Sequence, residues 1–368
     1  MESKDIFLFL TTLTEINPSK ISIKKLYSTL DDFTELFSGD LNIFKEKISK
    51  DDIERIKLIK SFFDEKKLNE IEKCLKGKEI NFLAYSEKDY PAKLKEISDP
   101  AFGLFYRGNL NLLNNSKSVA IVGTRNPTNY GLSMSRKIAS LLAEQKITIV
   151  SGLASGIDAA AHIGALESGK TIAVLGTGVD VAFPTCNKNL YEELLKKENL
   201  ILSEYPPETV GLPWNFPQRN RIISALSDAV LVIEGDLQSG ALITARFAIK
   251  QDKALFALPG PIDSPASNGP NILIKSGVAE LLTSINDILE KIGEDKQIEL
   301  DLKNNNEKLD GLSEKEKEIF KLLSSSPTNF DKLLQETNLS VQELSKHLSM
   351  LELKRLVEKT QDGGYVRA

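Results

Sequence analysis

Apolar and polar positions alternate along the middle of the chain so that strands and helices are predicted in turn. Six short apolar runs are expected as strands: 119–122, 147–150, 171–175, 200–202, 230–233 and 254–258. Helical patterns lie between them, and one of these places Met134, Ile138, Leu141 and Leu142 on a single face. Strands that are apolar on both faces and separated by helices form parallel sheets covered on both sides. The pattern therefore predicts a Rossmann-like, doubly wound, mostly parallel α/β sheet.

The segments before and after this core have different patterns. Residues 1–79 carry helical periodicity with almost no strand pattern, which predicts a small helical domain. From Ile80 a strand, a turn and a short helix precede a strand-like run from Phe102 to Arg107, which indicates extra strands attached to the core sheet. The core domain is therefore expected over 80–292, and the polar stretch 293–310 is expected to be a linker.

The last part of the chain, residues 311–368, predicts three short helices and a hairpin, which is the pattern of a winged helix. Two capping boxes, Ser313 with Glu316 and Ser340 with Glu343, mark helix starts. The third helix is expected to bury a stripe made of Val341, Leu344, Leu348 and Leu351.

The exposed side of that third helix bears on its function. A winged helix suggests that the third helix enters the major groove of duplex DNA. Its outward positions, however, hold one basic residue among five: Gln342, Glu343, Ser345, Lys346 and Ser349. Duplex-reading helices usually present more lysine and arginine. Contact with another protein, or weak accessory DNA binding, is therefore at least as well supported as duplex reading.

Composition narrows the class of protein. A chain of 368 residues with 41% hydrophobic and 27% charged residues is expected to be globular, with two or three domains. The net charge of −5 excludes a generally basic, histone-like surface, but nucleic-acid binding depends on local patches and stays possible. Two cysteines and two histidines without ligand spacing predict neither a disulfide framework nor a metal site. No apolar run suits a signal peptide or a membrane span, so we expect a cytoplasmic protein without membrane contact.

Dinucleotide binding is not predicted, because the glycine fingerprint is absent. After the first core strand Gly123 is followed by no glycine until Gly131, and the later Gly176-Thr177-Gly178 has Val181 at the third position. An acidic residue that would hold the ribose of NAD is also missing at the end of the second core strand.

A complete match to the P-loop pattern, Gly164 to Thr171, lies in the wrong structural context. A P-loop runs from strand to helix, so that backbone N–H groups face the phosphates. Here a helical pattern over 156–166 comes first and a strand follows. An ATP site is therefore not expected, and no cofactor is predicted.

Anion-binding groups gather in the loops that follow the core strands. These loops lie at one edge of a doubly wound sheet, where ligands bind. Guanidinium groups and helix N-termini suit a ligand with repeated phosphates. The candidate phosphate-binding residues are Gly123, Thr124, Arg125, Ser151, Gly152, Ser155, Gly156, Arg219, Asn220, Arg221, Ser239 and Gly240. Taken singly, Ser155 and Ser239 fit a helix cap as well as a ligand contact, and Arg219 and Arg221 point apart at i and i+2, so one of them can be a structural ion-pair partner.

No catalytic arrangement stands out among these residues. A G-x-S-x-G nucleophile elbow is absent, and His162 lies inside an alanine-rich helical run, where a core role is expected. Asp158 and Glu204 can serve an enzyme, but they can equally orient the arginines. The sheet edge is therefore interpreted as a site that binds a DNA backbone, not as an active site.

Eight motifs in a fixed order resemble the DNA-processing protein A family (DprA, also called Smf). They are VGTR, SGLASGIDAAAH, GTGVD with FPTCN, SEYPP, FPQRNRIIS, SGALITARFA, ALPG and SNGPNILIKSG, within about 80–292. The helical front, as a SAM-like domain, and the tail domain also fit that family. The resemblance implies an extended Rossmann fold that binds single-stranded DNA without cleaving it. It also implies a dimer that helps load the RecA recombinase onto DNA covered by single-strand-binding protein during natural transformation.

The resemblance also assigns residues. It implies that the phosphate-binding motif falls on Gly123 to Arg125, a basic pocket on Asn187 and Lys188, and the R-N-R-I-I element on Arg219 to Arg221. One departure is Ala101-Phe102-Gly103, where the family has a proline-rich run. Base stacking is expected of such a site, with Phe183 and Tyr191 as candidate rings.

Two other functions remain as alternatives. One is a nucleotide-processing hydrolase of the phosphoribohydrolase-like Rossmann class, whose P-G-G-x-G-T-x-x-E motif is broken here at Pro259-Gly260-Pro261. The other is a regulator that reads duplex DNA through the winged helix.

Overall fold

The computed structural model describes residues 3–12, 53, 54, 57, 61, 65–114, 117–294, 312–323, 327–337, 339–354, 356–360 and 363–367. The chain divides into two compact units, one of residues 1–127 and 135–295 and the other of residues 128–134 and 296–368. Much of the predicted helical domain over 1–79 lies outside the described residues; within it the structure has α1 (Ser3–Thr12) and α5 (Glu65–Gly77).

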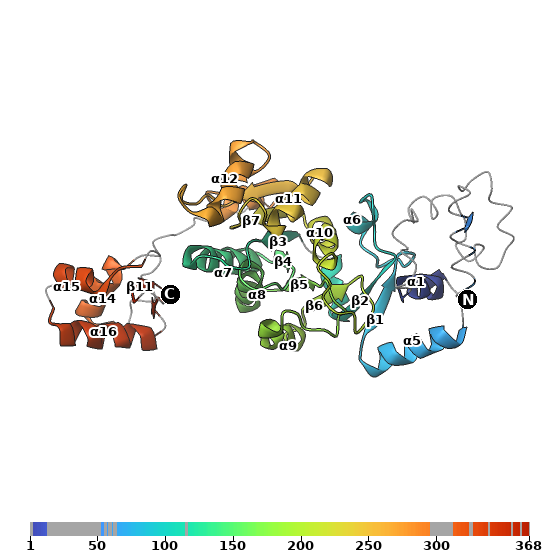
Figure 1. Ribbon diagram of the computed structural model, residues 1–368, viewed down its shortest axis with the longest axis horizontal. Helices are drawn as coiled ribbons and strands as arrows, with labels where there is room; N and C mark the ends of the chain where they lie inside the picture. Colours follow the sequence, from blue (N-terminus) through green and yellow to red (C-terminus); the bar gives the residue numbers. More distant parts are fainter. Residues whose placement is uncertain are drawn as a thin grey trace. The chain divides into compact units, whose positions relative to one another are not determined.

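Nine strands of the larger unit form one sheet (Figure 1). Their bounds are β1 (Asn81–Ala84), β2 (Gly103–Gly108), β3 (Ser118–Val122), β4 (Thr148–Ser151), β5 (Thr171–Val174), β6 (Leu200–Ser203), β7 (Ala229–Val232), β8 (Ala254–Ala257) and β9 (Glu280–Leu281). The order across the sheet is β1-β2-β6-β5-β4-β3-β7-β8-β9. Pairing is parallel from β6 to β9, whereas β1 with β2 and β2 with β6 are antiparallel. This confirms the predicted Rossmann-like sheet and its extra strands.

Helices connect the strands in the predicted alternation. They are α6 (Ala92–Lys95), α7 (Asn129–Glu144), α8 (Ile157–Ser168), α9 (Lys188–Lys196), α10 (Asn215–Leu226), α11 (Gly240–Lys250), α12 (Asn268–Lys275) and α13 (Ile285–Lys291), with short 3₁₀ turns at Leu110–Leu113, Thr185–Asn187 and Pro265–Ser267. From β3 the chain proceeds outward to β6, and α10 then carries it back to β7 on the other side of β3. The strand order therefore reverses at β3, which is where doubly wound sheets bind ligands.

The central strands are buried on both faces, as the apolar runs predict. All residues of β3, β4, β5, β6 and β7 are buried, and Ile121, Val150 and Leu231 have no exposed surface. Each such side chain contributes about 1.5–3 kcal/mol relative to an exposed one. The antiparallel extension is held by aromatic contacts, since the rings of Phe82 and Phe105 lie 5.0 Å apart.

The apparent P-loop has the reversed order expected from its pattern. Helix α8 runs to Ser168, Gly169 ends it, and β5 begins at Thr171. A Cβ added at Gly164 would lie 2.1 Å from the Arg136 carbonyl oxygen, so this glycine allows close helix packing. The Gly164–Thr171 stretch therefore has no loop that leads from a strand into a helix.

The smaller unit has the winged-helix elements: α14 (Glu314–Leu322), α15 (Phe330–Thr337), α16 (Val341–Leu353), β10 (Val357–Lys359) and β11 (Tyr365–Arg367), with β10 and β11 antiparallel. Both predicted capping boxes are present. Leu344, Leu348 and Leu351 are buried as predicted, but Val341 is 57% exposed. The prediction for Val341 was wrong because it is the first residue of α16, at the end of the stripe.

None of the helices in the described part of the chain has the length and hydrophobicity that a membrane span requires.

Candidate ligand-binding site

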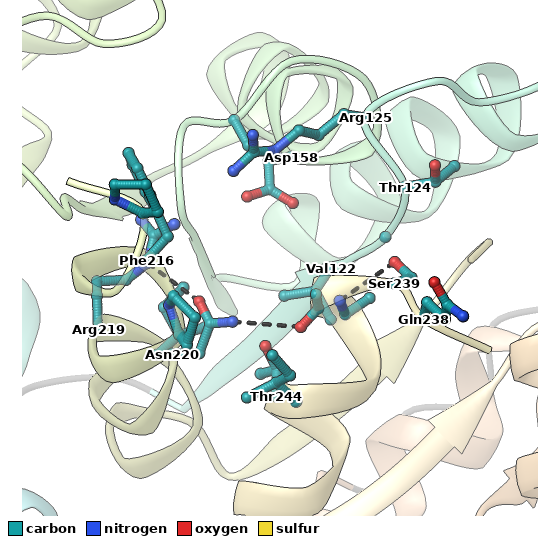
Figure 2. A pocket seen from close by; sticks show the side chains of 18 of the residues that line it. Val122, Thr124, Arg125, Asp158, Phe216, Arg219, Asn220, Gln238, Ser239 and Thr244 are labelled. Atoms are coloured by element: carbon teal, nitrogen blue, oxygen red, sulfur yellow. Dashed lines mark hydrogen bonds between the residues drawn. The ribbon is translucent and has the colours of Figure 1, made fainter. Parts of the chain in front are cut away.

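A cavity of about 640 Å³ opens at the carboxyl end of β3, where the strand order reverses. Its walls come from the loop after β3 and from the first turns of three helices, represented by Asp158 of α8, Phe216 of α10 and Gly240 of α11. In Figure 2, Phe216, Arg219 and Asn220 lie on one side of this cavity and Thr124, Gln238 and Ser239 on the other. Helix N-termini carry a partial positive charge, so the cavity suits an anionic ligand.

Arg125 is the exposed cation of the cavity wall. Its guanidinium carbon lies 5.4 Å from the centroid of the Phe216 ring, a cation–π contact. The loop that carries it is fixed at Thr124, whose N–H donates to the Glu234 carbonyl at 2.7 Å and whose own carbonyl accepts from Ile157 N–H at 3.2 Å. The loop backbone is therefore held in place, while the Arg125 guanidinium is accessible to a ligand.

Arg219 also lines the cavity, but it is buried and bonded to the backbone. Only 4% of it is exposed, and its Nη1 donates to the Gly152 carbonyl at 2.8 Å and to the Val174 carbonyl. Burial lowers its pKa to about 10. A Cβ at Gly152 would lie 2.6 Å from the guanidinium, so only glycine allows this approach. Arg219 therefore fastens α10 to the loop after β4 and to the end of β5.

Asp158 balances the charge of Arg219. The carboxylate is 6% exposed and accepts the Gly152 N–H at 3.1 Å. Burial raises the pKa of Asp158, and the nearby Arg219 charge opposes that rise. Since these two buried charges compensate each other, Arg125 supplies the accessible positive charge of the cavity wall.

Arg221 faces away from the cavity and is an ion-pair residue. Its Nη2 donates to Glu204, its Nε lies 3.3 Å from an Asp99 oxygen, and only 5% of it is exposed. This confirms that Arg219 and Arg221 point apart. The expectation that Arg221 binds phosphate is corrected, because its guanidinium is occupied on the other side of α10. Glu204 pairs with Arg221, which agrees with the role in orienting the arginines that the sequence suggested beside a catalytic one.

Several predicted site residues have structural roles. Ser151 is fully buried and donates its hydroxyl to the Ile121 carbonyl at 2.6 Å, so that hydroxyl is not available to a ligand. Gly156 caps α8 with a φ of +82°, and a Cβ there would lie 2.5 Å from the Thr124 carbonyl oxygen. Neither Gly156 nor Ser155 lines the cavity. Gly156 therefore serves the tight turn into α8.

The start of α11 lines the cavity as predicted. Ser239 caps the helix, and its Oγ accepts the Ala241 N–H at 3.3 Å. Gly240 is exposed, and Asn220 donates to its carbonyl at 3.3 Å. Asn220 also accepts from Arg219 Nε at 3.1 Å. The amide of Asn220 thus joins the second turn of α10 to the first turn of α11 in the cavity wall.

The loop after β5 contributes one of the expected aromatic rings. Phe183 lines the cavity and stacks on Phe216, with centroids 5.4 Å apart and planes 30° apart. Tyr191 is 5% exposed and donates its hydroxyl to the Val179 carbonyl, so its proposal as a stacking residue is wrong. Asn187 donates to the Leu153 carbonyl at 2.9 Å. Lys188 is exposed at the start of α9, and neither Asn187 nor Lys188 lines the cavity.

His162 occupies the core and not the site. It has no exposed surface, and its Nδ1 lies 2.7 Å from the Thr171 hydroxyl, which itself donates to the Ile149 carbonyl. Nδ1 must therefore be the donor in the contact with Thr171. Burial lowers the pKa of His162 to about 3, so the ring is neutral at pH 7. This confirms the predicted core role.

Among the polar and aromatic side chains of the cavity wall, four were not candidates from the sequence: Phe216, Asp236, Gln238 and Thr244. Phe216 lies in the FPQRNRIIS motif, three residues before Arg219, so its position at the start of α10 was the available signal. Its contact with Arg125 joins residues 91 positions apart in sequence, which no local pattern encodes.

Two family models match most of the chain. Residues 81–293 match the family described as DNA recombination-mediator protein A, and residues 304–363 match the DprA winged helix domain. The chain is 42% identical over 216 residues to the DNA processing protein DprA of Bacillus subtilis, covering 58% of this chain and 72% of that protein. It is 38% identical over 323 residues to Protein Smf of Synechocystis, covering 79% of this chain and 81% of that protein.

The solved structures similar to this one include those of two DNA processing proteins A. The X-ray structure of DNA processing protein A from Streptococcus pneumoniae has a TM-score of 0.67 at 34% identity, covering 79% of this chain and 98% of that chain. DNA processing protein A from Helicobacter pylori, whose structure concerns its single-stranded DNA binding mode, has a TM-score of 0.53 at 34% identity, covering 59% of this chain and 97% of that chain.

Proposed function

The chain belongs to the DNA recombination-mediator protein A family, and from that premise we propose that it binds single-stranded DNA without cleaving it. The observation that carries the proposal is the contact of Arg125 with Phe216 in the wall of the 640 Å³ cavity. A guanidinium suits a phosphate and an aromatic ring suits a base, which are the two repeating parts of a single strand. The single-stranded DNA binding described for the Helicobacter pylori relative supports the same ligand here.

We further propose that the bound strand is passed to a RecA recombinase on DNA covered by single-strand-binding protein, during natural transformation. The description of the matching family as a DNA recombination mediator supports this part. The test is the rate at which RecA filaments form on covered single strands, with and without the protein. A rate that is unchanged by the protein contradicts the mediator role while leaving DNA binding intact.

A homodimer is proposed from the edge of the sheet. The last strand, β9, carries Leu281 at 45% exposure, and Ile272 and Val278 nearby in sequence are 48% and 44% exposed. Apolar side chains beside an unpaired strand edge favour association with another chain. Leu281→Lys is expected to convert the dimer to monomer in light scattering, and an unchanged mass contradicts this surface.

The non-catalytic part of the proposal is supported by the contacts of the acidic and imidazole side chains. Asp158 is bonded to Gly152 N–H, Glu204 to Arg221, and His162 to Thr171 inside the core. Each of the three groups considered for general acid or base chemistry thus makes at least one hydrogen bond within the protein. Release of free base from nucleotides, lost on changing Asp158 or Glu204, would favour the hydrolase alternative.

The test of DNA binding is the salt dependence of affinity in an Arg125→Ala variant. For single strands, the logarithm of the binding constant falls linearly with the logarithm of the salt concentration, with a slope of about −0.7 per phosphate contact. Removing one guanidinium contact is therefore expected to weaken binding and to make the slope less steep by about 0.7. Fluorescence anisotropy of a labelled oligothymidine at several salt concentrations measures both.

The matched control is Arg136→Ala, which removes an arginine that is also exposed but lies outside the cavity. Arg136 pairs with Glu167 on the surface of α7 and α8. We expect affinity and slope in this variant to equal those of the wild type. If Arg125→Ala behaves like Arg136→Ala, the cavity is not the DNA site.

A further inference from the structure

The single tryptophan of the chain, Trp214, lies directly before α10 and is 67% exposed. Although it occupies the N-cap position, its side chain makes no capping hydrogen bond. Within the described residues, no other ring or cation stacks on the indole. A large aromatic surface is normally buried or used in contacts. The indole of Trp214 is therefore available to a ligand.

The position of Trp214 is continuous with the cavity. Its neighbour Pro213 and the ring of Phe216, two residues later, both line the cavity. The Phe216 ring contacts both the Phe183 ring and the Arg125 guanidinium. A strand that leaves this cavity past Pro213 and Phe216 would pass beside Trp214.

We propose that the indole of Trp214 stacks on a base of the same strand, outside the nucleotide held in the cavity; this rests on the proposed function. Every base has a π-face, so such a contact adds affinity without sequence preference. The DNA-binding site would then include Trp214 as well as the cavity, and would contact more than one nucleotide of the single strand.

The segment that carries Trp214 is held in advance of binding. Glu208 N–H donates to Asp180 at 2.8 Å, and Lys78 bridges both carboxylates at 2.7 and 2.6 Å. Directly after Trp214, the buried Asn215 side chain donates to the Gly176 carbonyl at 3.1 Å. A ring on a segment fixed at both ends loses little conformational entropy when a base stacks on it.

The experiment uses the full chain and an unlabelled oligothymidine. Because Trp214 is the chain's one tryptophan, its fluorescence reports this position alone. We expect quenching that saturates at the same DNA concentration as anisotropy. Trp214→Ala is expected to raise Kd roughly 5- to 150-fold, the effect of losing one stacked base. The salt slope should not change, because the indole carries no charge.

Two variants serve as controls. Trp214→Phe keeps a ring and is expected to recover most of the affinity. Val210→Ala removes an apolar side chain that is 63% exposed and lies four residues earlier, outside the cavity. It is expected to change Kd by less than about twofold.

Each contrary result has a distinct meaning. Normal anisotropy binding with unchanged tryptophan fluorescence and a wild-type Kd for Trp214→Ala overturns the stacking proposal and leaves the proposed function standing. Absence of single-stranded DNA binding by the wild type overturns the proposed function itself. Full DNA affinity of Trp214→Ala with lost stimulation of RecA filaments would make Trp214 a protein contact, which also overturns stacking.

Discussion

Replacing Arg219 with alanine should act on stability more than on ligand contact. Arg219 is 4% exposed, and its Nη1 donates to the carbonyls of Gly152 and Val174. Without it, both carbonyls lose a buried donor. The buried Asp158 carboxylate also loses the positive charge that opposes its desolvation. The expected result is a less stable core.

The magnitude follows from these lost partners. Removing one member of a buried charged pair costs about 3–5 kcal/mol of unfolding free energy. An unpaired buried carbonyl alone costs about 1–3 kcal/mol, which is consistent with that range. For units of this size, each kcal/mol lowers Tm by about 2–4 °C. Arg219→Ala should therefore lower Tm by roughly 6–20 °C.

Urea and thermal unfolding at pH 7, followed by far-UV circular dichroism, measure this loss. Arg125→Ala is the matched control, because it removes an exposed arginine of the same cavity and should change stability by no more than about 0.5 kcal/mol. Adding Asp158→Asn to Arg219→Ala should restore part of the loss, with a coupling of about 0.5–3 kcal/mol. Wild-type stability of Arg219→Ala, together with a flatter salt slope for DNA, would show instead that Arg219 is a phosphate ligand.

Three further predictions concern other parts of the chain. The pKa of His162 is about 3 in the folded protein, below its ordinary value, so between pH 7 and pH 5 the unfolded chain takes up a proton that the folded chain does not. The free energy of unfolding, measured with urea, should therefore fall by about 2 kcal/mol from pH 7 to pH 5. His162→Gln should lose this pH dependence. Glu204→Gln should lower the free energy of unfolding by about 3 kcal/mol, since the buried Arg221 then keeps only the half-exposed Asp99 as an ion-pair partner. The salt slope for DNA binding should stay unchanged, and a changed slope would contradict the structural role of Glu204. Deleting the chain after Gly311 should preserve affinity for single strands, because the cavity lies in the larger unit. Loss of single-strand affinity would contradict this, and loss of duplex binding alone would assign duplex binding to the winged helix.

The sheet could be predicted closely because its strands are short apolar runs buried on both faces. The predicted run 119–122 becomes β3 at 118–122, and 254–258 becomes β8 at 254–257. Burial of a whole apolar run does not depend on which residues distant in sequence pack against it, so the local pattern is enough to predict the strand. Position within an element mattered where the prediction failed: Val341 has the spacing of a buried residue but lies at the helix start.

The site could be predicted to the level of loops but not of side chains. The strand-to-helix loops after β3 and β7 do meet at one cavity, because parallel strands end at the same edge. Sequence does not tell which side of α10 packs on the sheet. Residues at i and i+2 of a helix point apart, so the packing of α10 decides which of Arg219 and Arg221 reaches the cavity. That packing depends on contacts distant in sequence, such as Gly152 and Glu204.

Arg219 and Arg221 of the FPQRNRIIS motif therefore position the site more than they contact a ligand. Arg219 bonds α10 to the sheet edge and Arg221 bonds its other side to Glu204, so the helix is fixed on two sides. A helix held in this way presents Phe216 from its first turn to the Arg125 guanidinium. Changes at either buried arginine should then weaken DNA binding through the orientation of α10, with loss of stability. A change at Arg125 should weaken binding through lost charge alone, and the salt slope separates the two causes.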